Sequence, residues 1–195
     1  MTAKIENTRV LVCGGAGYIG SNMTAMLEAS GHKQVVFDNL SKGHRTTVQD
    51  SEFVKGDLAD YDLLVKTLRK YKIEAVMHFA AFTEVSESVQ LPLKYYRNNL
   101  SNAQNLLSAM ETAGVEKFVF SSSAAVYGIP PKVPITEDSP KEPINPYGET
   151  KWAVERMCHY RAGQVNCDMR RFGISMPVVQ EKFPGSEKTI GRNHI

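Results

Sequence analysis

A glycine-rich segment between an expected strand and an expected helix constrains the fold of this chain more than any other feature. Residues 10–13 form a short apolar run, and Gly14, Gly17 and Gly20 follow at the start of a stretch compatible with a helix. Glycines there let the backbone turn tightly and approach a pyrophosphate, while helix N-terminal amides supply hydrogen bonds and partial positive charge. A glycine-rich loop alone is weak evidence for a dinucleotide site, because an ordinary turn can have the same composition. Its place between a strand and a helix therefore carries the prediction of a dinucleotide site.

An acidic residue at the end of the next expected strand completes this pattern. Asp38 follows the apolar run 35–37, about 20 residues beyond the glycines, where a carboxylate accepts hydrogen bonds from the adenosine ribose hydroxyls. A carboxylate there would repel a 2′-phosphate, which favours NAD over NADP. Lys42, His44 and Arg45 follow closely and could neutralise a phosphate, so NADP stays open as the lesser alternative.

Strands and helices are expected to alternate along the rest of the chain. The helix over 93–113 rests on apolar residues at every third or fourth position, with Gly114 placed to stop it. Prolines between 130 and 146 exclude regular structure there. Further strands are predicted at 53–54, 75–79, 117–121 and 168–172, and further helices at 63–71 and 147–160. Six strands alternating with helices predict an α/β fold of the Rossmann type, a doubly wound parallel sheet with helices on both faces.

The length, charge and cysteine usage favour one domain with a small-molecule ligand. The 195 residues are 42% hydrophobic, which suffices for one core, and the net charge of +2 gives no electrostatic case for a nucleic-acid or membrane-surface partner. Cys13, Cys158 and Cys167 lack the spacing of metal ligands, and their odd number excludes a complete disulfide framework. No apolar run approaches the roughly 18 residues of a membrane span, and the N-terminus carries no apolar signal segment. A cytoplasmic location follows by default.

None of the five histidines is expected to act in catalysis or to bind a metal. His32 and His44 lie in expected loops, and His194 lies in the C-terminal tail. His78 is expected to pack at the end of a strand, and His159 to lie on a helical surface.

Asp57 has two interpretations of about equal weight. It directly follows the third expected strand, where a carboxylate could bind the amine of an adenine. The same residue could instead cap the N-terminus of the helix that follows.

A tyrosine and a lysine four positions apart indicate acid–base chemistry. Tyr147 and Lys151 begin an expected helix and would project from one face of it. A nearby ammonium favours the phenolate form of a tyrosine, and a phenolate is a general base for an alcohol about to lose a hydride. Such pairs also occur by chance on solvated helical faces. Ser123 strengthens the assignment because it ends an upstream strand, where ligands of parallel sheets bind and its hydroxyl could contact a sugar oxygen; alone, it would be read as a strand terminus.

The order of several motifs resembles the UDP-glucose 4-epimerase family of extended short-chain dehydrogenases/reductases. The matching segments are GGAGYIGS at 14–21, Asp38-Asn39-Leu40-Ser41, Gly56-Asp57-Leu58, His78-Phe79-Ala80, Glu87-Ser88, Pro92 with Tyr95-Tyr96 and Asn98-Asn99, FSSSAAVYG at 120–128, PITED at 134–138 and NPYG at 145–148. The agreement extends over most of the chain, which makes the resemblance specific.

This resemblance implies a catalytic trio of Ser123, Tyr147 and Lys151 and a larger set of contacts to NAD. That set is Gly14, Gly17, Tyr18, Ile19, Gly20, Asp38, Asn39, Asp57, Leu58, Phe79, Ala80, Asn98, Tyr147 and Lys151. The implied reaction interconverts UDP-galactose and UDP-glucose. Tyr147 takes the proton of the sugar 4-hydroxyl while hydride passes to NAD, the 4-keto sugar turns over, and hydride returns to its other face. The implied partner is a UDP-hexose, and a homodimer stays open.

The chain also departs from the family pattern. A lysine that the family often has near Thr83 is missing, and Arg170-Arg171-Phe172-Gly173 replaces Arg-Tyr-Phe-Asn, whose asparagine reaches the nucleotide sugar. Because the match is poor after Gly163, we expect residues 1–172 to form the NAD-binding domain and 173–195 a divergent tail in a loop or disordered. The C-terminal substrate-binding part of the family is expected to be largely absent, and activity of the chain alone to be weak.

Two alternatives stay open. One is another nucleotide-sugar epimerase or a dehydratase; dehydratases usually carry an acidic pair next to the catalytic serine, whereas this chain has Ala124-Ala125. The other is a truncated, non-catalytic NAD-binding protein, which the poor match after Gly163 supports.

Overall fold

The computed structural model describes residues 7–48 and 50–162 and confirms the expected fold class. Five strands form one sheet in the order β3-β2-β1-β4-β5, and every neighbouring pair is parallel. The strands are β1 Arg9–Cys13, β2 Lys33–Asp38, β3 Glu52–Lys55, β4 Ala75–His78 and β5 Lys117–Phe120. The sixth expected strand, at 168–172, lies outside the described residues.

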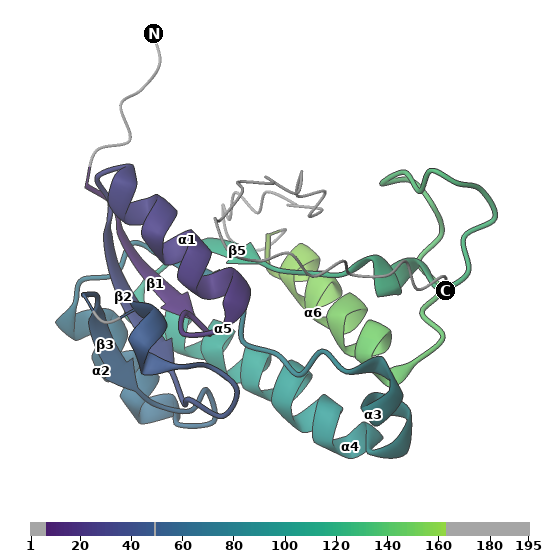
Figure 1. Ribbon diagram of the computed structural model, residues 1–195, viewed down its shortest axis with the longest axis horizontal. Coiled ribbons are helices and arrows are strands. Elements are labelled where there is room, and N and C mark those ends of the chain that lie inside the picture. The colour runs from purple at the N-terminus through teal and green to yellow at the C-terminus, as the bar shows by residue number, and fades with distance from the viewer. Residues whose placement is uncertain (1–6, 49, 163–195) are drawn as a thin grey trace, which may run out of the picture.

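Helices cover both faces of this sheet, as a doubly wound fold requires (Figure 1). The α-helices are α1 Tyr18–Ala29, α2 Tyr61–Lys70, α3 Val85–Gln90, α4 Pro92–Tyr95, α5 Asn102–Ala113 and α6 Pro146–Ala162, with 3-10 turns η1 Arg45–Val48 and η3 Ala124–Tyr127 and a π-helical turn η2 Tyr96–Ser101. Helix α1 packs on one face, and α2 and α5 pack together on the other.

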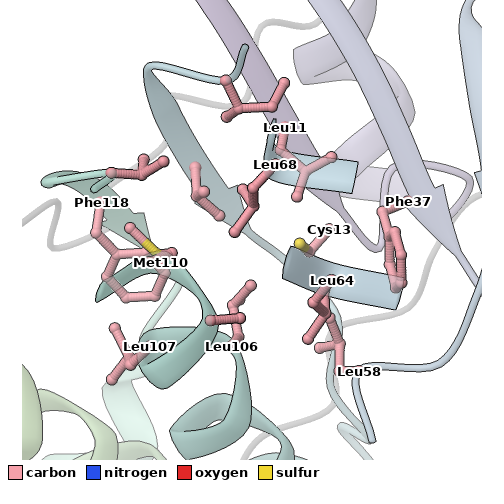
Figure 2. Close-up of a cluster of buried hydrophobic side chains, with 14 of the residues drawn as sticks. Leu11, Cys13, Phe37, Leu58, Leu64, Leu68, Leu106, Leu107, Met110 and Phe118 are labelled. Carbon is pink, nitrogen blue, oxygen red and sulfur yellow. The ribbon is translucent and has the colours of Figure 1, made fainter. Parts of the chain in front are cut away.

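The alternation of side chains along β1 explains the two layers. Leu11 and Cys13 point into the larger cluster, among side chains of α2 and α5 such as Leu64 and Leu106 (Figure 2). Val10 and Val12, one position out of phase, pack against α1 on the opposite face. A strand buried on both faces is typical of the centre of a parallel sheet, which accounts for the uninterrupted apolar run in the sequence.

The helix expected over 93–113 is interrupted by the π-helical turn η2. A π turn takes in an additional residue, so it shifts the side chains before it relative to those after it. Tyr95 is therefore fully buried, whereas Tyr96, one of the regularly spaced apolar residues that predict this helix, is only partly buried. The expected end of this helix is confirmed, since Gly114 adopts the left-handed conformation with φ of 73°.

Asn99 gives a physical reason for the π turn. It is buried, and its side-chain amide bonds the main chain of Phe82 in both directions, with N···O distances of 2.9 Å each. Its Nδ2 also donates to Thr150 Oγ1 at 3.4 Å. The turn thus directs one polar side chain inward to join the loop after β4 to α6.

The strand order creates a crevice at the carboxyl edge of the sheet. Strands β2 and β3 lie on one side of β1, and β4 and β5 lie on the other. Chain segments leaving β1 and β4 therefore diverge to opposite faces, which is the topological switch point where open α/β sheets bind ligands.

Candidate functional site

A pocket at the carboxyl ends of β1, β2 and β4 holds about 620 Å³ of space that opens to solvent. Its walls come from the glycine-rich turn and from the loops that follow β2, β3 and β4. The lining residues are Gly14, Gly17, Phe37, Asp38, Asn39, Ser41, Lys42, Gly43, Gly56, Asp57, Leu58, Phe79, Ala80, Ala81, Phe82, Asn98 and Asn102. Its position is the one expected of a dinucleotide site.

The glycine-rich turn depends on the absence of side chains. Gly14 has a φ of 74°, and a Cβ there would lie 2.5 Å from the main-chain nitrogen of Ala80. A Cβ on Gly20 would lie 2.2 Å from the carbonyl oxygen of Gly14. These two glycines therefore let the turn, the loop after β4 and the start of α1 come into direct contact.

Gly17 has a different function from its neighbours in the turn. A Cβ there would meet one atom within 4 Å, the Gly14 carbonyl oxygen at 3.3 Å, so the missing side chain leaves space at the pocket wall. Gly17 is also the N-cap of α1 and supplies no capping side chain. The first-turn amides, at Tyr18, Ile19 and Gly20, consequently have no side-chain acceptor, an arrangement that suits an anion.

Asp38 is 8% exposed and faces the glycine turn. Its Oδ2 accepts from Ala16 N at 3.0 Å, and its Oδ1 accepts from Leu40 N at 2.8 Å. The carboxylate thus fixes the turn and its own loop while it lines the pocket.

A second carboxylate forms the far wall. Asp57 Oδ2 accepts from Asn39 Nδ2 at 2.7 Å, and its Oδ1 accepts from Ala59 N at 2.9 Å. The helix-cap interpretation of Asp57 is wrong, because Asp60 caps α2 through a bond from Leu63 N to its side chain at 3.0 Å. Asp57 instead contributes a polar wall to the pocket.

Most of the expected cofactor residues lie together in this pocket. Those that line it are Gly14, Gly17, Asp38, Asn39, Asp57, Leu58, Phe79, Ala80 and Asn98. Tyr18, Ile19 and Gly20 lie beside it in the first turn of α1, and Tyr147 and Lys151 lie on α6. Sequence reasoning did not assign Ser41, Lys42, Gly43, Ala81, Phe82 and Asn102 to the pocket wall, although all lie within a few residues of one that was identified.

Arg45 is occupied away from the pocket. Its guanidinium donates to the carbonyl oxygen of Ser51 at 3.4 Å, and it lies over the ring of Phe53 at 4.6 Å from the centroid. It does not line the pocket. One of the three residues that left NADP open is therefore engaged elsewhere.

Lys151 is buried between β5 and α6. Its Nζ donates to the carbonyl oxygen of Ser121 at 2.8 Å and lies 4.8 Å from the ring centroid of Phe120. Burial disfavours the charged form and lowers the pKa of Lys151 to about 8, so the ammonium persists at neutral pH. Its Nζ is also 5.9 Å from the ring centroid of Tyr147, which is 9% exposed. The first two turns of α6 thus place the phenol and the cation on the same side, as the spacing predicted.

Ser123 ends the segment after β5 and caps the turn η3, where its Oγ accepts from Ala125 N at 3.2 Å. Ser122 donates to Glu155 of α6. A Cβ on Gly148 would lie 2.6 Å from the Ala125 carbonyl oxygen, so α6 begins in close contact with η3. The structure thereby brings the elements that carry Ser123, Tyr147 and Lys151 together.

Two of the described histidines lie where the sequence placed them, His78 at the end of a strand and His159 on a helical surface. His78 is 1% exposed and lies 5.7 Å from Phe120 between ring centroids. Burial and the charge of Lys151 lower the pKa of His78 to about 3, so it is neutral in the folded protein. His159 is exposed on α6. Within residues 7–48 and 50–162, no three His, Cys, Asp or Glu residues are grouped so that they could hold a metal ion.

The cysteines that the structure describes, Cys13 and Cys158, are buried free thiols. Burial and the nearby Asp38 raise the pKa of the Cys13 thiol, which keeps it protonated. Among the helices of the described residues, none combines the length and the apolar character that a membrane crossing requires.

Curated proteins that are similar to this chain in sequence include several UDP-glucose 4-epimerases. UDP-glucose 4-epimerase of Lactobacillus helveticus is 55% identical over 150 residues, which cover 76% of this chain and 46% of that protein. UDP-glucose 4-epimerase of Rhizobium leguminosarum bv. trifolii is 49% identical over 189 residues, covering 95% of this chain and 55% of the relative. The chain thus spans about half the length of the curated relatives it matches.

Solved structures show the same similarity. The UDP-glucose 4-epimerase from Brucella ovis in complex with NAD has a TM-score of 0.81 and 46% identity, over 83% of this chain and 50% of that one. The enzyme from Bifidobacterium longum in complex with NAD+ and UDP has a TM-score of 0.78 and 35% identity, over 80% and 50% of the two chains. A family match also spans residues 10–175. This chain therefore belongs to the NAD dependent epimerase/dehydratase family.

Proposed function

We propose that this chain supplies the NAD-binding and catalytic part of a UDP-glucose 4-epimerase that interconverts UDP-galactose and UDP-glucose. The observation that carries the proposal is the co-occurrence of two sites on one sheet. A glycine-lined pocket lies at the ends of β1, β2 and β4, and a buried Lys151 lies with Tyr147 at the end of β5. The relatives that match over 95% of the chain, and therefore across both sites, are UDP-glucose 4-epimerases.

The pocket fits a dinucleotide in three respects. The uncapped amides of α1 and the space beside Gly17 suit a pyrophosphate. Asp38, although it already accepts two main-chain bonds, keeps a place in the pocket wall from which a carboxylate can accept from ribose hydroxyls. Asp57 and Asn98 add polar groups to the walls. Tyr18 and Ile19 contribute main-chain amides in this proposal, since the side chain of Tyr18 is 88% exposed.

The proposed chemistry assigns separate tasks to three residues. Bound NAD would accept hydride from the sugar C4 and return it. Tyr147 accepts the proton of the 4-hydroxyl and later donates it back, and Ser123 hydrogen-bonds the reacting sugar oxygen. Lys151 holds positive charge beside the phenol, because Ser121 fixes its ammonium on the same side of α6. No metal is required for this proton transfer.

We propose residues 1–172 as the cofactor domain of this protein and a UDP-hexose as its substrate. The proposal of a UDP-sugar draws support from the Bifidobacterium longum structure, whose ligands are NAD+ and UDP. A homodimer is proposed from three exposed apolar residues, Val89 of α3, Leu93 of α4 and Leu91 between the two helices, since such patches mark contact surfaces.

Calorimetric titration of NAD, followed by an assay that couples formation of UDP-glucose from UDP-galactose to a dehydrogenase, tests the proposal. We expect NAD to bind and Tyr147→Phe to remove any conversion while NAD still binds. Failure to bind NAD would contradict the assignment of the pocket. Conversion that survives in Tyr147→Phe would contradict the assignment of the base.

A further inference from the structure

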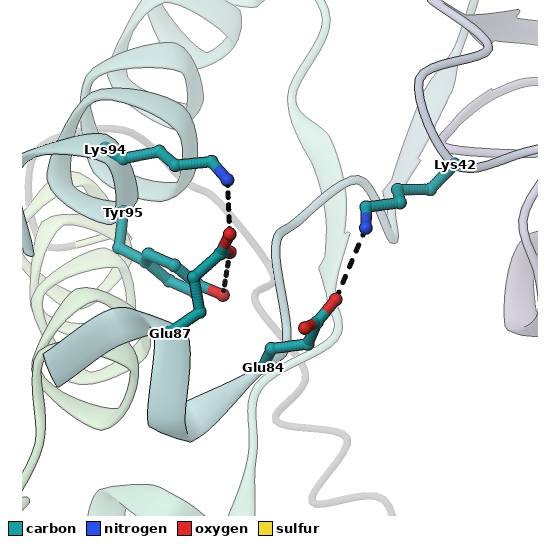
Figure 3. Close-up of polar contacts among 5 residues, drawn as sticks. All are labelled: Lys42, Glu84, Glu87, Lys94 and Tyr95. Atoms are coloured by element: carbon teal, nitrogen blue, oxygen red, sulfur yellow. Dashed lines mark hydrogen bonds and ion pairs between the residues drawn. The ribbon is translucent and has the colours of Figure 1, made fainter. Parts of the chain in front are cut away.

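Lys42 and Glu84 connect two loops across the switch point of the sheet. Lys42 follows β2, Glu84 follows β4, and β1 with its glycine turn lies between these strands. Lys42 Nζ is 3.3 Å from Glu84 Oε1 (Figure 3). The ion pair therefore spans the carboxyl end of β1, where the pocket lies.

The main chain beside Lys42 is held firmly against the glycine turn. His44 N donates to the carbonyl oxygen of Ala16 at 3.0 Å, and Thr47 Oγ1 donates to the same oxygen at 3.1 Å. A Cβ on Gly43 would lie 2.7 Å from the carbonyl carbon of Ala16. Lys42 thus has a fixed backbone at the edge of the pocket and a long side chain that can exchange partners.

The side chains of the pocket wall carry more negative than positive charge, which disfavours the phosphates of a dinucleotide. Two carboxylates, Asp38 and Asp57, line the pocket, and Lys42 is the one cationic side chain among the described residues that line it. A pyrophosphate brings further negative charge, against which the amides of α1 provide only about half a positive charge. Lys42 is therefore the group that can compensate a phosphate here by a full charge.

The partner of Lys42 can release it at low cost. The side chains of Lys42 and Glu84 are 70% and 61% exposed, and an ion pair so open to water contributes little to stability. Glu87, in the helix that follows Glu84, differs because Lys94 and the buried Tyr95 hold its carboxylate at 2.6 and 2.9 Å (Figure 3). Of these two carboxylates, Glu84 is the one whose partner can move to a ligand.

We propose that Lys42 is a phosphate-binding residue of the dinucleotide pocket and that Glu84 competes with the ligand for its ammonium. The inference rests on the proposed binding of NAD. In the free chain the ion pair spans the pocket entrance. When the dinucleotide binds, Lys42 leaves Glu84 for a pyrophosphate oxygen, so the affinity for NAD includes the cost of separating the pair.

Calorimetric titration of NAD into the wild-type chain, Lys42→Met, Glu84→Gln and the double variant tests this exchange. We expect Lys42→Met to raise the Kd about tenfold, which corresponds to one charge-assisted hydrogen bond. Glu84→Gln is expected to lower the Kd roughly two- to fourfold, the range for a surface ion pair. The double variant is expected to match Lys42→Met, because Glu84 acts only through Lys42. Each difference should shrink when salt is raised.

Two exposed residues at the opposite end of the sheet provide matched controls. Lys33→Met and Glu28→Gln change the net charge equally but lie at the start of β2 and the end of α1, so the Kd for NAD should stay unchanged. Adenosine lacks the phosphates of ADP-ribose, so the two ligands separate phosphate contacts from other contacts. Lys42→Met should weaken binding of ADP-ribose but not of adenosine. Thermal unfolding without ligand checks that every variant folds.

The possible results separate this inference from the proposed function. A wild-type chain that does not bind NAD overturns both. NAD binding that is unaffected by Lys42→Met overturns the inference and leaves the proposed function intact. Weaker binding by Glu84→Gln would show that Glu84 assists the ligand instead of competing with it, which also contradicts the inference.

Discussion

The two sides of the described sheet differ in how much of a ligand site they contain. At the ends of β1, β2 and β4, side chains and main chain enclose a pocket whose glycines fit their neighbours closely. At the end of β5, Tyr147 and Lys151 are buried and Lys151 is hydrogen-bonded to Ser121, but the adjoining loop leaves Ile129 and Ile144 79% and 67% exposed. Within the described residues the proposed cofactor side forms a pocket, whereas the proposed catalytic side presents apolar surface that no described residue covers.

This difference implies that the two steps of the proposed reaction have different structural requirements. Cofactor binding depends on contacts that the described residues make among themselves. Turnover also requires the sugar to be held against the reacting groups, and the matched region covers only about half of each curated relative. The comparison predicts a chain that binds NAD well and converts sugar poorly.

Turnover is where the largest effect is expected. We predict that the 195-residue chain alone converts UDP-galactose at least about 100-fold more slowly than a full-length relative, because an error of about 1 Å in substrate position costs that much. Remote contacts to the nucleotide supply the positioning, so kcat falls as well as affinity. The coupled assay with both proteins at equal concentration measures the ratio.

A chimera provides the control for this prediction. Residues 1–162, which include all of α6, joined to the part of the Lactobacillus helveticus enzyme that follows this region should regain conversion, since the two chains are 55% identical over 150 residues. If the isolated chain converted UDP-galactose as fast as the relative, the proposed difference between the two sides of the sheet would be wrong, because the catalytic side would need no further residues.

The glycine turn provides the next largest effect. Gly14→Ala should destabilise the chain by about 1–3 kcal/mol from overpacking against Ala80, in addition to the strain of a positive φ. It should also abolish measurable NAD binding, because the turn and the loop after β4 must separate. Denaturant unfolding and calorimetry record the two losses.

Gly31 offers a matched control for the backbone strain. It has a φ of 78°, but a Cβ added there would meet no atom within 4 Å. Gly31→Ala should therefore show the strain alone and retain NAD binding. Equal losses in both variants would show that the close approach at Gly14 contributes nothing.

The preference for NAD over NADP tests the proposed role of Asp38 on the cofactor side of the sheet. We predict that NADP binds roughly tenfold more weakly than NAD or worse, because a 2′-phosphate would meet the carboxylate of Asp38 while Arg45 is engaged by Ser51 and Phe53. Calorimetry with the two dinucleotides at the same ionic strength measures the ratio. Equal or tighter binding of NADP would refute this reading of Asp38.

The smallest expected effect is on stability at acidic pH. It tests the packing of His78, which ends β4 on the cofactor side and lies against Phe120 of β5 on the catalytic side. His78 has a folded pKa of about 3 against an ordinary value of 6.5, so the unfolded chain binds the additional proton between these values. Stability should therefore fall as pH decreases through this window, by about 1 kcal/mol between pH 6.5 and 5.5. In His78→Phe this part of the loss should be missing, as denaturant unfolding at both pH values will show. The same pH dependence in wild type and variant would contradict a buried, neutral His78.

The fold class and the glycine turn could be predicted from the sequence because local signals indicate them. Glycines after an apolar run and an acid after the next are properties of contiguous segments, and the structure places Gly14, Gly17 and Asp38 around one pocket. Lys151 was found in the same way, through its spacing from Tyr147.

The errors arose where distant segments decide the local structure. The π turn at 96–101 accompanies the bonds of Asn99 to Phe82, a residue in another loop. Periodicity within one helix contains no information about that partner. For a similar reason, the sequence suggested only that Lys42 could neutralise a 2′-phosphate. The position of Lys42 in the pocket wall depends on how its loop packs against Ala16, and the sequence does not reveal that packing.

The acceptor that holds the ammonium of Lys151 belongs to the main chain of Ser121. Every amino acid at position 121 offers the same carbonyl group, so a missense change there can alter the side chain but cannot delete the acceptor. Inherited variation can remove this contact directly only at position 151. A single codon, that of residue 151, therefore decides whether this particular bond between the segment after β5 and helix α6 can form.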